Sequence, residues 1–273
     1  MDTASDPSVD GPPSEAGAAP ASILSKAFEL LTAFGPERRV LTLSQLSRHS
    51  GLPKSTVHRL IGRLVPLGFL EPHGSGFRLG IRIRTLAAAM PVESLRESAL
   101  PHLAHLHKWS TAHVHLAALR DDQVAFVERF VPSGSTLRTG QPGDVLPAHA
   151  TAVGKALLAF VTPNEVHRAL ERPLRASTPR TLTDPADLDR ELRVVRETRV
   201  AYARDEWRLG VSCIAAPVVM RGRAVGAVSV SVPTGEEFGR QHADAVRVVA
   251  DRIARDNQAV LAQGHDDWFP VVG

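Results

Sequence analysis

One stretch, residues 51–64 (GLPKSTVHRLIGRL), restricts the fold of this chain more than any other. Its apolar residues recur at helical spacing and therefore predict a buried stripe on a helix. They are Val57, Leu60, Ile61 and Leu64. Gly51 interrupts any preceding helix, and Pro53 is tolerated near a helix start because its missing N–H would have no partner there. The polar residues between the apolar ones must project from the opposite face.

The segments on both sides complete the pattern of a winged helix-turn-helix. Residues 22–34 and 43–49 have helical periodicity, and Ser50-Gly51 makes a tight turn before the helix of 51–64. Residues 68–71 and 76–79 predict two short strands around a Gly-rich tip. In this arrangement the third helix enters the DNA major groove and the hairpin lies along the backbone. We therefore predict a DNA-binding domain over residues 21–80.

The polar face of the helix supplies the expected contacts to double-stranded DNA. Lys, Ser and Thr at a helix N-terminus suit phosphates, because the free N–H groups there attract anions. Arg59 is best placed for bidentate contact with guanine, whereas Arg63 and Arg78 are expected to touch phosphates. Taken alone, residues 51–64 could equally form an ordinary solvated helix face. The predicted DNA-binding residues are Lys54, Ser55, Thr56, His58, Arg59, Arg63 and Arg78.

The distribution of charge decides between these two interpretations. Residues 1–20 hold four acids and no Lys or Arg, residues 21–96 hold eleven Lys or Arg and four acids, and residues 97–273 hold 21 of each. The whole basic excess therefore lies in the segment that contains the predicted helix-turn-helix, as binding to a polyanion requires.

The rest of the chain predicts an α+β fold with a mainly antiparallel sheet flanked by helices. We expect a disordered tail over residues 1–20, a linker and dimerisation helix over 81–97, an effector-binding domain over 98–263 and a C-terminal tail over 264–273. Within the large domain the pattern predicts a helix over 94–109 with a break or kink near Pro101. It predicts a hairpin whose strands cover 114–118 and 124–130, and further strands over 136–139, 211–219 and 224–232. Further helices are predicted over 150–161, from 163, over 183–198 and over 237–261.

Three separated stretches resemble the IclR family of bacterial transcriptional regulators (the isocitrate lyase regulator family). They lie within residues 25–60, in residues 146–156 (LPAHATAVGKA) and in residues 210–218 (GVSCIAAPV), the last followed by VSVS at 228–231. Three matches in the same order are far more specific than a helix-turn-helix alone. The resemblance implies a winged helix-turn-helix domain, a linker helix and a C-terminal effector-binding domain. It also implies a homodimer or homotetramer on palindromic operators.

The resemblance further implies a small-molecule effector, commonly an organic acid or aromatic catabolite, and most simply a repressor relieved by it. By position, the implied effector-binding residues are Ala152, Val153, Gly154, Cys213, Ser229 and Ser231. Backbone N–H groups at a helix start are physically suited to hold a carboxylate. The family often has an acidic residue ten positions before the cysteine, and here that position is Ala203. We therefore expect an apolar or aromatic acid rather than a small hydroxy- or oxo-acid.

Two other classes of protein are compatible with single features of the sequence. Cys213 with His149 as base would suit a hydrolase or transferase, although a lone cysteine in an apolar strand is usually a core or pocket residue. The histidines of residues 102–115 would suit a metal-dependent sensor, although no Cys or acid accompanies them at ligand spacing before Asp121. Neither class explains the basic excess over 21–96. We expect no catalytic site, metal or cofactor.

The cellular compartment is predicted from what the chain does not contain. Cys213 is the single cysteine, so no intrachain disulfide is possible and a reducing compartment is suitable. No apolar run approaches the roughly 20 residues that a membrane helix needs. The N-terminus is acidic and does not resemble a signal peptide. We expect a cytoplasmic protein.

Overall fold

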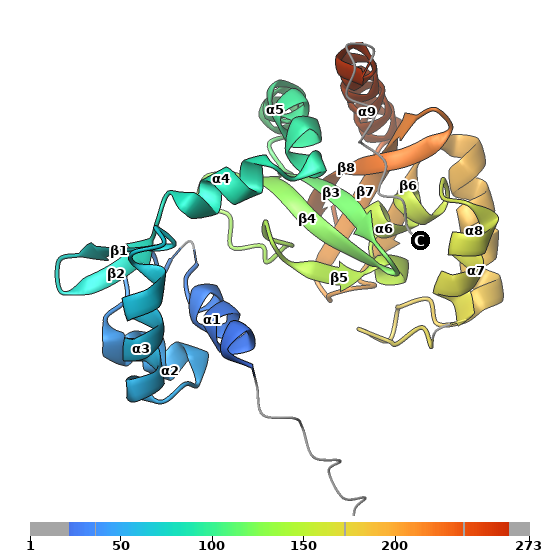
Figure 1. Cartoon of the computed structure of the whole chain (residues 1–273). Coiled ribbons are helices and arrows are strands. Elements are labelled where there is room, and N and C mark those ends of the chain that lie inside the picture. The colour runs from blue at the N-terminus through green and yellow to red at the C-terminus, as the bar shows by residue number, and fades with distance from the viewer. Residues whose placement is uncertain (1–21, 36, 172, 237, 262–273) are drawn as a thin grey trace, which may run out of the picture. The chain divides into compact units, whose positions relative to one another are not determined.

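The computed structural model describes residues 22–261 except 36, 172 and 237, and they form two units that divide after Ala89 (Figure 1). The predicted tails, residues 1–20 and 264–273, lie outside the described residues, as does position 237, where the last helix was expected to begin. Among the described helices, none is both long and apolar enough to cross a membrane.

The first unit is the winged helix-turn-helix that the sequence predicts. Its elements are α1 (Ile23–Thr32), α2 (Leu43–Ser50), α3 (Lys54–Leu64), β1 (Leu70–His73), β2 (Gly76–Leu79) and α4 (Arg82–Ala88). α2 begins with a reciprocal capping box between Thr42 and Gln45. The predicted apolar stripe of α3 is buried and packs with α1 and α2 in one core. Pro53 is the residue before the first turn of α3 rather than its first member.

Local hydrogen bonds fix the turn and the hairpin of this unit. Gly51 ends α2 with a φ of 71°, a left-handed conformation that favours glycine. The Ser50 hydroxyl donates to the Leu46 carbonyl at 2.7 Å. Leu41 and Phe77 exchange both backbone hydrogen bonds, at 2.9 and 3.0 Å, which the sequence did not predict. This bridge ties the hairpin to the segment that leads into α2.

A six-stranded antiparallel sheet forms the centre of the second unit, in the order β5-β4-β3-β8-β7-β6. Its strands are β3 (His113–Arg120), β4 (Gln123–Phe130), β5 (Val145–Pro147), β6 (Ala201–Arg204), β7 (Val211–Met220) and β8 (Arg223–Pro233). The α+β class and the antiparallel sheet that we predicted are therefore confirmed.

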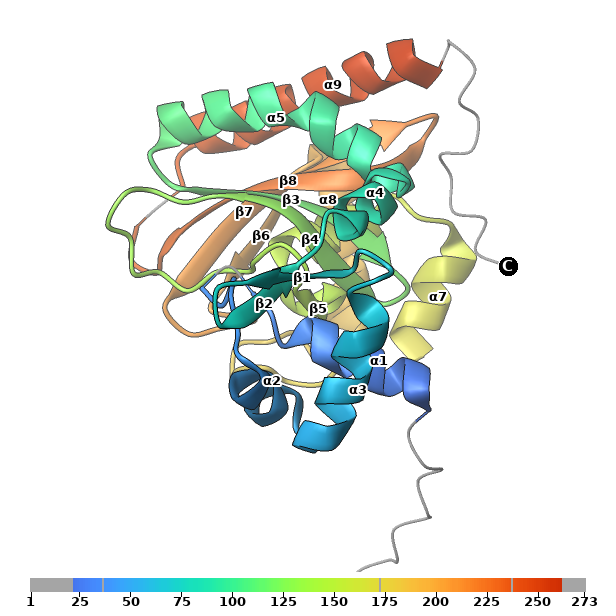
Figure 2. The ribbon, with the colours of Figure 1, turned by 60° about the vertical axis from the view of Figure 1, so that its left-hand side comes forward.

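Helices cover both faces of this sheet. α5 (Pro91–Ser110) and α9 (Arg240–Leu261) lie side by side over one face (Figures 1 and 2). The opposite core contains α6 (Ala152–Leu158), α7 (Pro163–Glu171) and α8 (Pro185–Thr198). Because strand residues alternate between faces, Ile214 of β7 belongs to the first core and Ala215 to the second.

Two of the predicted elements near β4 and α6 need correction. Residues 136–139 form no strand, because Thr139 turns its hydroxyl inward to hydrogen bond with two histidines, and β5 instead pairs with β4. The helix predicted over 150–161 is shorter, because Thr151 caps α6 after a 3₁₀ turn over Ala148–Ala150. The sequence also did not predict β6.

The linker region differs from the prediction in its helix boundaries. α4 ends at Ala88, and Pro91 is the first residue of α5, where a proline is well tolerated. α5 then continues through Pro101 without a break. A proline removes one backbone hydrogen bond of a helix, and the packing of α5 against β3 and α9 holds the helix together across this position.

Candidate functional site

The exposed face of α3 carries most of the predicted DNA contacts. Its exposed polar residues are Lys54, Ser55, His58, Arg59 and Arg63, and Thr56 is half-buried. Within the described residues, neither Arg59 nor Arg63 forms an ion pair with a carboxylate. The buried stripe of the same helix holds this face outward, so both guanidinium groups are free to meet a polyanion.

Arg78 of the hairpin is held differently. It pairs with Glu71 on the opposite strand at 2.9 Å, and this hydrogen bond holds the pKa of Glu71 below its usual range. The Arg78 side chain remains 51% exposed. A phosphate contact from Arg78, which stays a prediction, would have to compete with this ion pair.

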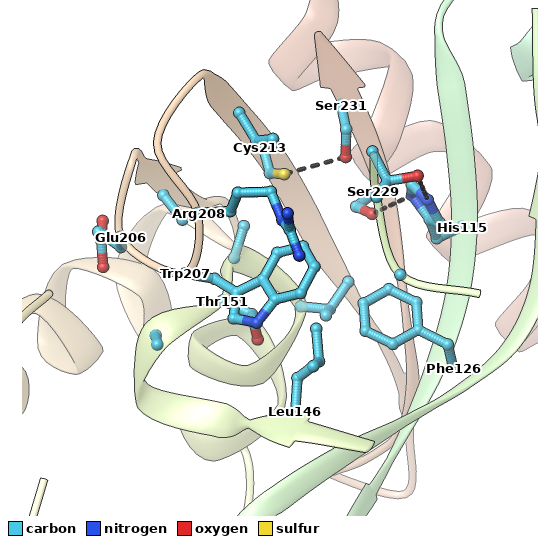
Figure 3. A pocket seen from close by; sticks show the side chains of 17 residues that line it. His115, Phe126, Leu146, Thr151, Glu206, Trp207, Arg208, Cys213, Ser229 and Ser231 are labelled. Atoms are coloured by element: carbon cyan, nitrogen blue, oxygen red, sulfur yellow. Dashed lines mark hydrogen bonds between the residues drawn. The ribbon is translucent and has the colours of Figure 1, made fainter. Parts of the chain in front are cut away.

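The second unit contains a pocket on the sheet face opposite α5 and α9 (Figure 3). The empty space among its lining residues is about 420 Å³, part of which is open to solvent. Apolar side chains from β4, β5 and the start of α6 form much of the wall. They include Phe126, Leu146, Ala152 and Val153. Such a pocket fits a compact, largely apolar ligand.

Residues from two adjacent rows across four neighbouring strands form the floor of the pocket. The strand register places His115 beside Ser229, Ser231 beside Cys213, and Cys213 beside Ala203. The predicted residues Cys213, Ser229 and Ser231 therefore come together in one place. Ala203 lies directly beside Cys213, which explains why a position ten residues before the cysteine belongs to the same site.

The polar groups of the floor are uncharged. His115 hydrogen bonds through Nε2 with Thr139 Oγ1 at 3.0 Å and through Nδ1 with Ser229 Oγ at 3.4 Å (Figure 3). Burial lowers the pKa of His115 to about 3, so the ring is neutral at pH 7. A neutral imidazole and two hydroxyls can each donate or accept, which suits an uncharged polar group of a ligand.

The floor does not provide a nucleophile paired with a base. Cys213 Sγ lies 2.9 Å from Ser231 Oγ, and burial raises the pKa of the Cys213 thiol to about 11. His149 instead hydrogen bonds through Nε2 with the Arg175 carbonyl at 3.0 Å. The thiol therefore stays protonated and has no imidazole beside it, so the enzyme alternative loses its mechanism.

The start of α6 contributes less to the pocket than the sequence predicts. Thr151 Oγ1 accepts the Gly154 N–H at 3.0 Å, so this donor is already used within the helix. A Cβ on Gly154 would lie 2.1 Å from the Ala148 carbonyl oxygen. Ala152 and Val153 line the pocket, whereas Gly154 does not. The geometry thus gives Gly154 a packing role and removes the support for its predicted contact with an effector.

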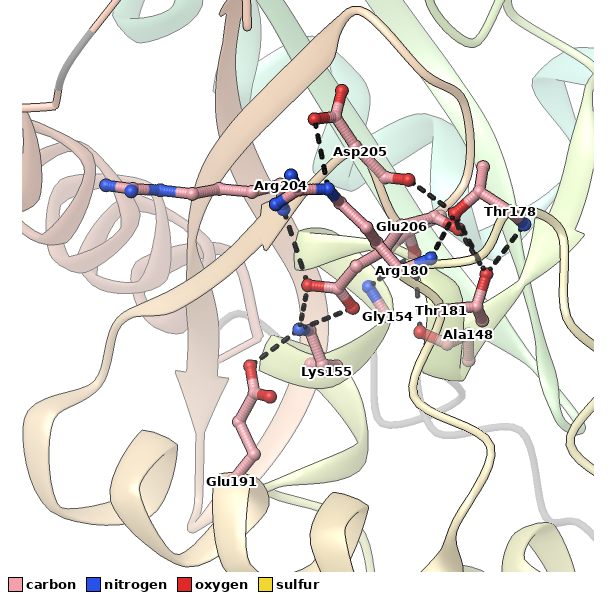
Figure 4. Close-up of polar contacts among 11 residues, drawn as sticks. Ala148, Gly154, Lys155, Thr178, Arg180, Thr181, Glu191, Arg204, Asp205 and Glu206 are labelled. Carbon is pink, nitrogen blue, oxygen red and sulfur yellow. Dashed lines mark hydrogen bonds and ion pairs between the residues drawn. The ribbon is translucent and has the colours of Figure 1, made fainter. Parts of the chain in front are cut away.

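Sequence reasoning missed the charged side of the pocket. Glu206, Trp207 and Arg208 follow β6 and line the cavity. Lys155 of α6 is completely buried, and its Nζ lies 2.9 Å from both carboxylate oxygens of Glu206 and 2.6 Å from Glu191 Oε1 (Figure 4). The signal that the sequence offers for this region is the alternation of alanine with larger polar residues in Ala201–Arg204, which matches the buried and exposed positions of β6.

The histidines of residues 102–115 do not converge. His102 pairs with Asp256 at 2.7 Å, and His107 Nδ1 hydrogen bonds with the Ala112 carbonyl at 2.8 Å. In the described part of the chain, no group of three His, Cys, Asp or Glu side chains could hold a metal ion. The metal-sensor alternative therefore has no supporting geometry.

A helix-turn-helix unit with a basic exposed helix, joined in one chain to an α+β unit with a small pocket, defines a DNA-binding regulator with an effector-binding domain. Residues 23–74 match the model of the IclR helix-turn-helix domain, and residues 87–256 match that of the bacterial transcriptional regulator IclR C-terminal domain. The chain belongs to the IclR family of bacterial transcriptional regulators.

Similar proteins agree with this assignment. The DNA-binding transcriptional repressor YiaJ of Escherichia coli is 34% identical over 70% of this chain and 71% of its own, and the regulator Rv1719 of Mycobacterium tuberculosis is 31% identical over 80% and 85%. An IclR homologue from Microbacterium hydrocarbonoxydans, solved with 4-hydroxybenzoate, is 30% identical over 87% of this chain and 100% of its own, with a TM-score of 0.76. The chain is thus a transcriptional regulator and not an enzyme.

Proposed function

We propose that this regulator is a repressor whose binding to an operator is weakened by an aromatic or apolar carboxylic acid held in the pocket. The exposed basic face of α3 is the observation that carries the DNA-binding part. The small apolar pocket with its uncharged polar floor supports the choice of effector. The homologue solved with 4-hydroxybenzoate and the repressor YiaJ support the effector class and the sign of regulation.

We further propose the division of labour along the chain. Residues 21–80 would bind DNA, residues 81–97 would link and dimerise, and residues 98–263 would bind the effector. A homodimer or homotetramer would read a palindromic operator, because a two-fold axis in the protein repeats each contact on both half-sites. Such a protein would work in the cytoplasm, where the bacterial chromosome lies.

The residues proposed to touch DNA and effector follow from these placements. Lys54, Ser55, Thr56, His58 and Arg59 would contact the operator, with Arg63 and Arg78 on phosphates. Cys213, Ser229, Ser231, Ala152 and Val153 would surround the effector. The acid could change operator affinity only by binding one arrangement of the protein more tightly than another.

Replacing Arg59 with Ala tests the DNA-binding part. A bidentate contact with guanine is worth about 1–3 kcal/mol of discrimination, so the variant should lose specific binding while keeping its fold. Affinity for the duplex upstream of the protein's own gene would be measured by mobility shift, beside a scrambled duplex. Arg252→Ala is the matched control, because Arg252 is an exposed arginine of α9, outside residues 21–97.

Three outcomes separate the roles of these arginines. Loss of preference for the upstream duplex in Arg59→Ala alone supports base recognition. Arg63→Ala should weaken binding to both duplexes equally and reduce the slope of log affinity against log salt by about 1. Unchanged affinity of Arg59→Ala for the upstream duplex would refute the assignment of α3 as the recognition helix.

The effector class has its own test. Calorimetric titration would compare aromatic acids with small hydroxy- and oxo-acids. Because Ala203 places a methyl group beside Cys213, we expect tighter binding of the aromatic acids. A clear preference for small hydroxy- or oxo-acids would overturn this part of the proposal.

A further inference from the structure

We infer that Arg208 binds the carboxylate of the effector and that Trp207 orients this arginine, an assignment that rests on the proposed effector class. It places the anion on the loop between β6 and β7. The start of α6, where the sequence predicted the anion, would then contact the apolar part of the ligand.

Arg208 is a cation that lines the pocket and is available to bind an anionic ligand. Its guanidinium carbon lies 4.7 Å from the centre of the Trp207 ring, and it forms no ion pair with any described carboxylate. Figure 3 shows the guanidinium extending from the β6–β7 loop over the drawn side chains, beside the Trp207 ring. Stacking on an aromatic face limits the directions that a guanidinium can take and leaves its N–H groups free for a planar carboxylate.

The carboxylate that lines the pocket beside Arg208, that of Glu206, already has a cation as its partner. Glu206 and Arg208 are the acidic and the basic side chain that line the pocket in the described part of the chain, and the ring of His115 is neutral. Both oxygens of Glu206 accept hydrogen bonds from the buried Lys155. Lys155 itself does not line the cavity. Arg208 is therefore the cation of the pocket lining that has no carboxylate partner among the described residues.

The loop that carries Arg208 is fixed before any ligand arrives. Asp205 has a φ of 59°, and its Oδ1 accepts the Gly210 N–H and the Thr234 hydroxyl, both at 2.7 Å. The Thr178 hydroxyl donates to the Asp205 carbonyl at 2.6 Å (Figure 4). Binding a ligand through Arg208 then needs little ordering of the backbone, which favours affinity.

The competing positions for the anion are weaker. α6 has seven residues, and Thr151 already takes the Gly154 N–H. The floor offers hydroxyls, a protonated thiol and a neutral imidazole, which would receive an uncharged polar group more readily than an anion. We therefore assign the carboxylate end of the ligand to Arg208 and its uncharged end to the floor.

Calorimetry with matched acid and amide pairs tests this orientation. The probes are benzoate, 4-hydroxybenzoate and phenylacetate, each beside its neutral amide, titrated into the full-length wild type, Arg208→Gln, Arg208→Lys and Arg204→Gln. Arg204 is an exposed arginine of β6 whose side chain does not line the pocket, so it controls for general charge. Thermal melts would check that each variant is folded.

The outcomes separate this assignment from the proposed function. We expect the wild type and Arg204→Gln to prefer an acid over its amide on the order of tenfold or more, Arg208→Gln to lose that preference, and Arg208→Lys to keep part of it. Equal preference in Arg208→Gln and the wild type would overturn the assignment while leaving an aromatic-acid effector in place. If the wild type binds none of the acids, the effector class fails and the assignment fails with it.

Discussion

Replacing Lys155 with Met removes the ammonium group that Glu206 and Glu191 share. The two carboxylates then have no cation between them. Lys155 is completely buried, whereas the side chains of Glu206 and Glu191 are 12% and 30% exposed. Met has a similar length and fills the same space without the charge. The variant therefore isolates the electrostatic role of the lysine from its packing.

The size of the effect follows from this burial. Breaking a buried ion pair by removing one partner costs about 3–5 kcal/mol, because the remaining charge is left without compensation. Water reaches part of Glu191, which favours the lower end of that range, so we expect a loss of about 3 kcal/mol in the free energy of unfolding. For a unit of this size the melting temperature should fall by roughly 6–12 °C.

The loss should also depend on pH in a definite direction. Burial already raises the pKa of Glu206, and the loss of Lys155 removes the strongest opposing influence. A carboxyl with a raised pKa in the folded protein binds its proton more tightly there than in the unfolded chain. Protonation of this group therefore favours the folded state at low pH, and that contribution is lost as the pH rises through the folded pKa. The deficit of Lys155→Met should therefore be larger at pH 8 than at pH 5.

Thermal and urea unfolding of the wild type, Lys155→Met and Lys108→Met would measure both effects. Lys108 is an exposed lysine near the end of α5, so its replacement should change stability by less than about 0.5 kcal/mol. A deficit below about 1 kcal/mol for Lys155→Met, or a deficit that grows toward pH 5, would contradict a buried lysine that neutralises both carboxylates.

Two further substitutions test the packing and the neutral floor of the pocket. Gly154→Ala would place a Cβ 2.1 Å from a backbone oxygen, so we expect the free energy of unfolding, measured with a chemical denaturant, to fall by about 1–3 kcal/mol or more. In the control Gly62→Ala the new Cβ meets nothing within 4 Å, so this variant should not be destabilised. Equal stability of the two variants would contradict the packing role of Gly154. His115→Gln removes a ring whose folded pKa, about 3, lies below its ordinary value of 6.5, so the wild type alone should lose about 2 kcal/mol from this group between pH 7 and pH 5. A stability difference between wild type and His115→Gln that is constant over this range would argue against a buried neutral ring.

Elements with local signals could be predicted from the sequence. α2 and α8 begin at side-chain caps, Thr42 and Asp184, which act within a few residues of themselves. The apolar spacing of α3 likewise identified its buried stripe. Thr139 misled the prediction, because a β-branched residue favours strands and this one uses its hydroxyl to bind buried histidines instead. β6, with four residues, was too short to stand out from its surroundings.

The charged part of the pocket depends on contacts that no local pattern contains. Arg208 owes its position to a loop held by Thr178 and Thr234, which lie 27 and 29 residues from Asp205. Lys155 would be expected on a solvated helix face, and its burial follows from carboxylates 36 and 51 residues later in the chain. The resemblance identified Cys213, Ser229 and Ser231, but only the strand register places Ser231, Cys213 and Ala203 in one row and Ser229 in the next.

Coupling between the two units would be measured as the difference in operator affinity with and without a bound acid. Fluorescence anisotropy would follow the binding of wild-type protein to the duplex upstream of its own gene, at several salt concentrations and with saturating aromatic acid. We predict salt-sensitive binding that weakens at least about fivefold when the acid is bound, which is the lower end of ordinary coupling between sites. No salt-sensitive binding to this duplex, or the same affinity with the acid bound as without it, would contradict the coupling of a basic DNA-binding unit to a ligand-binding unit.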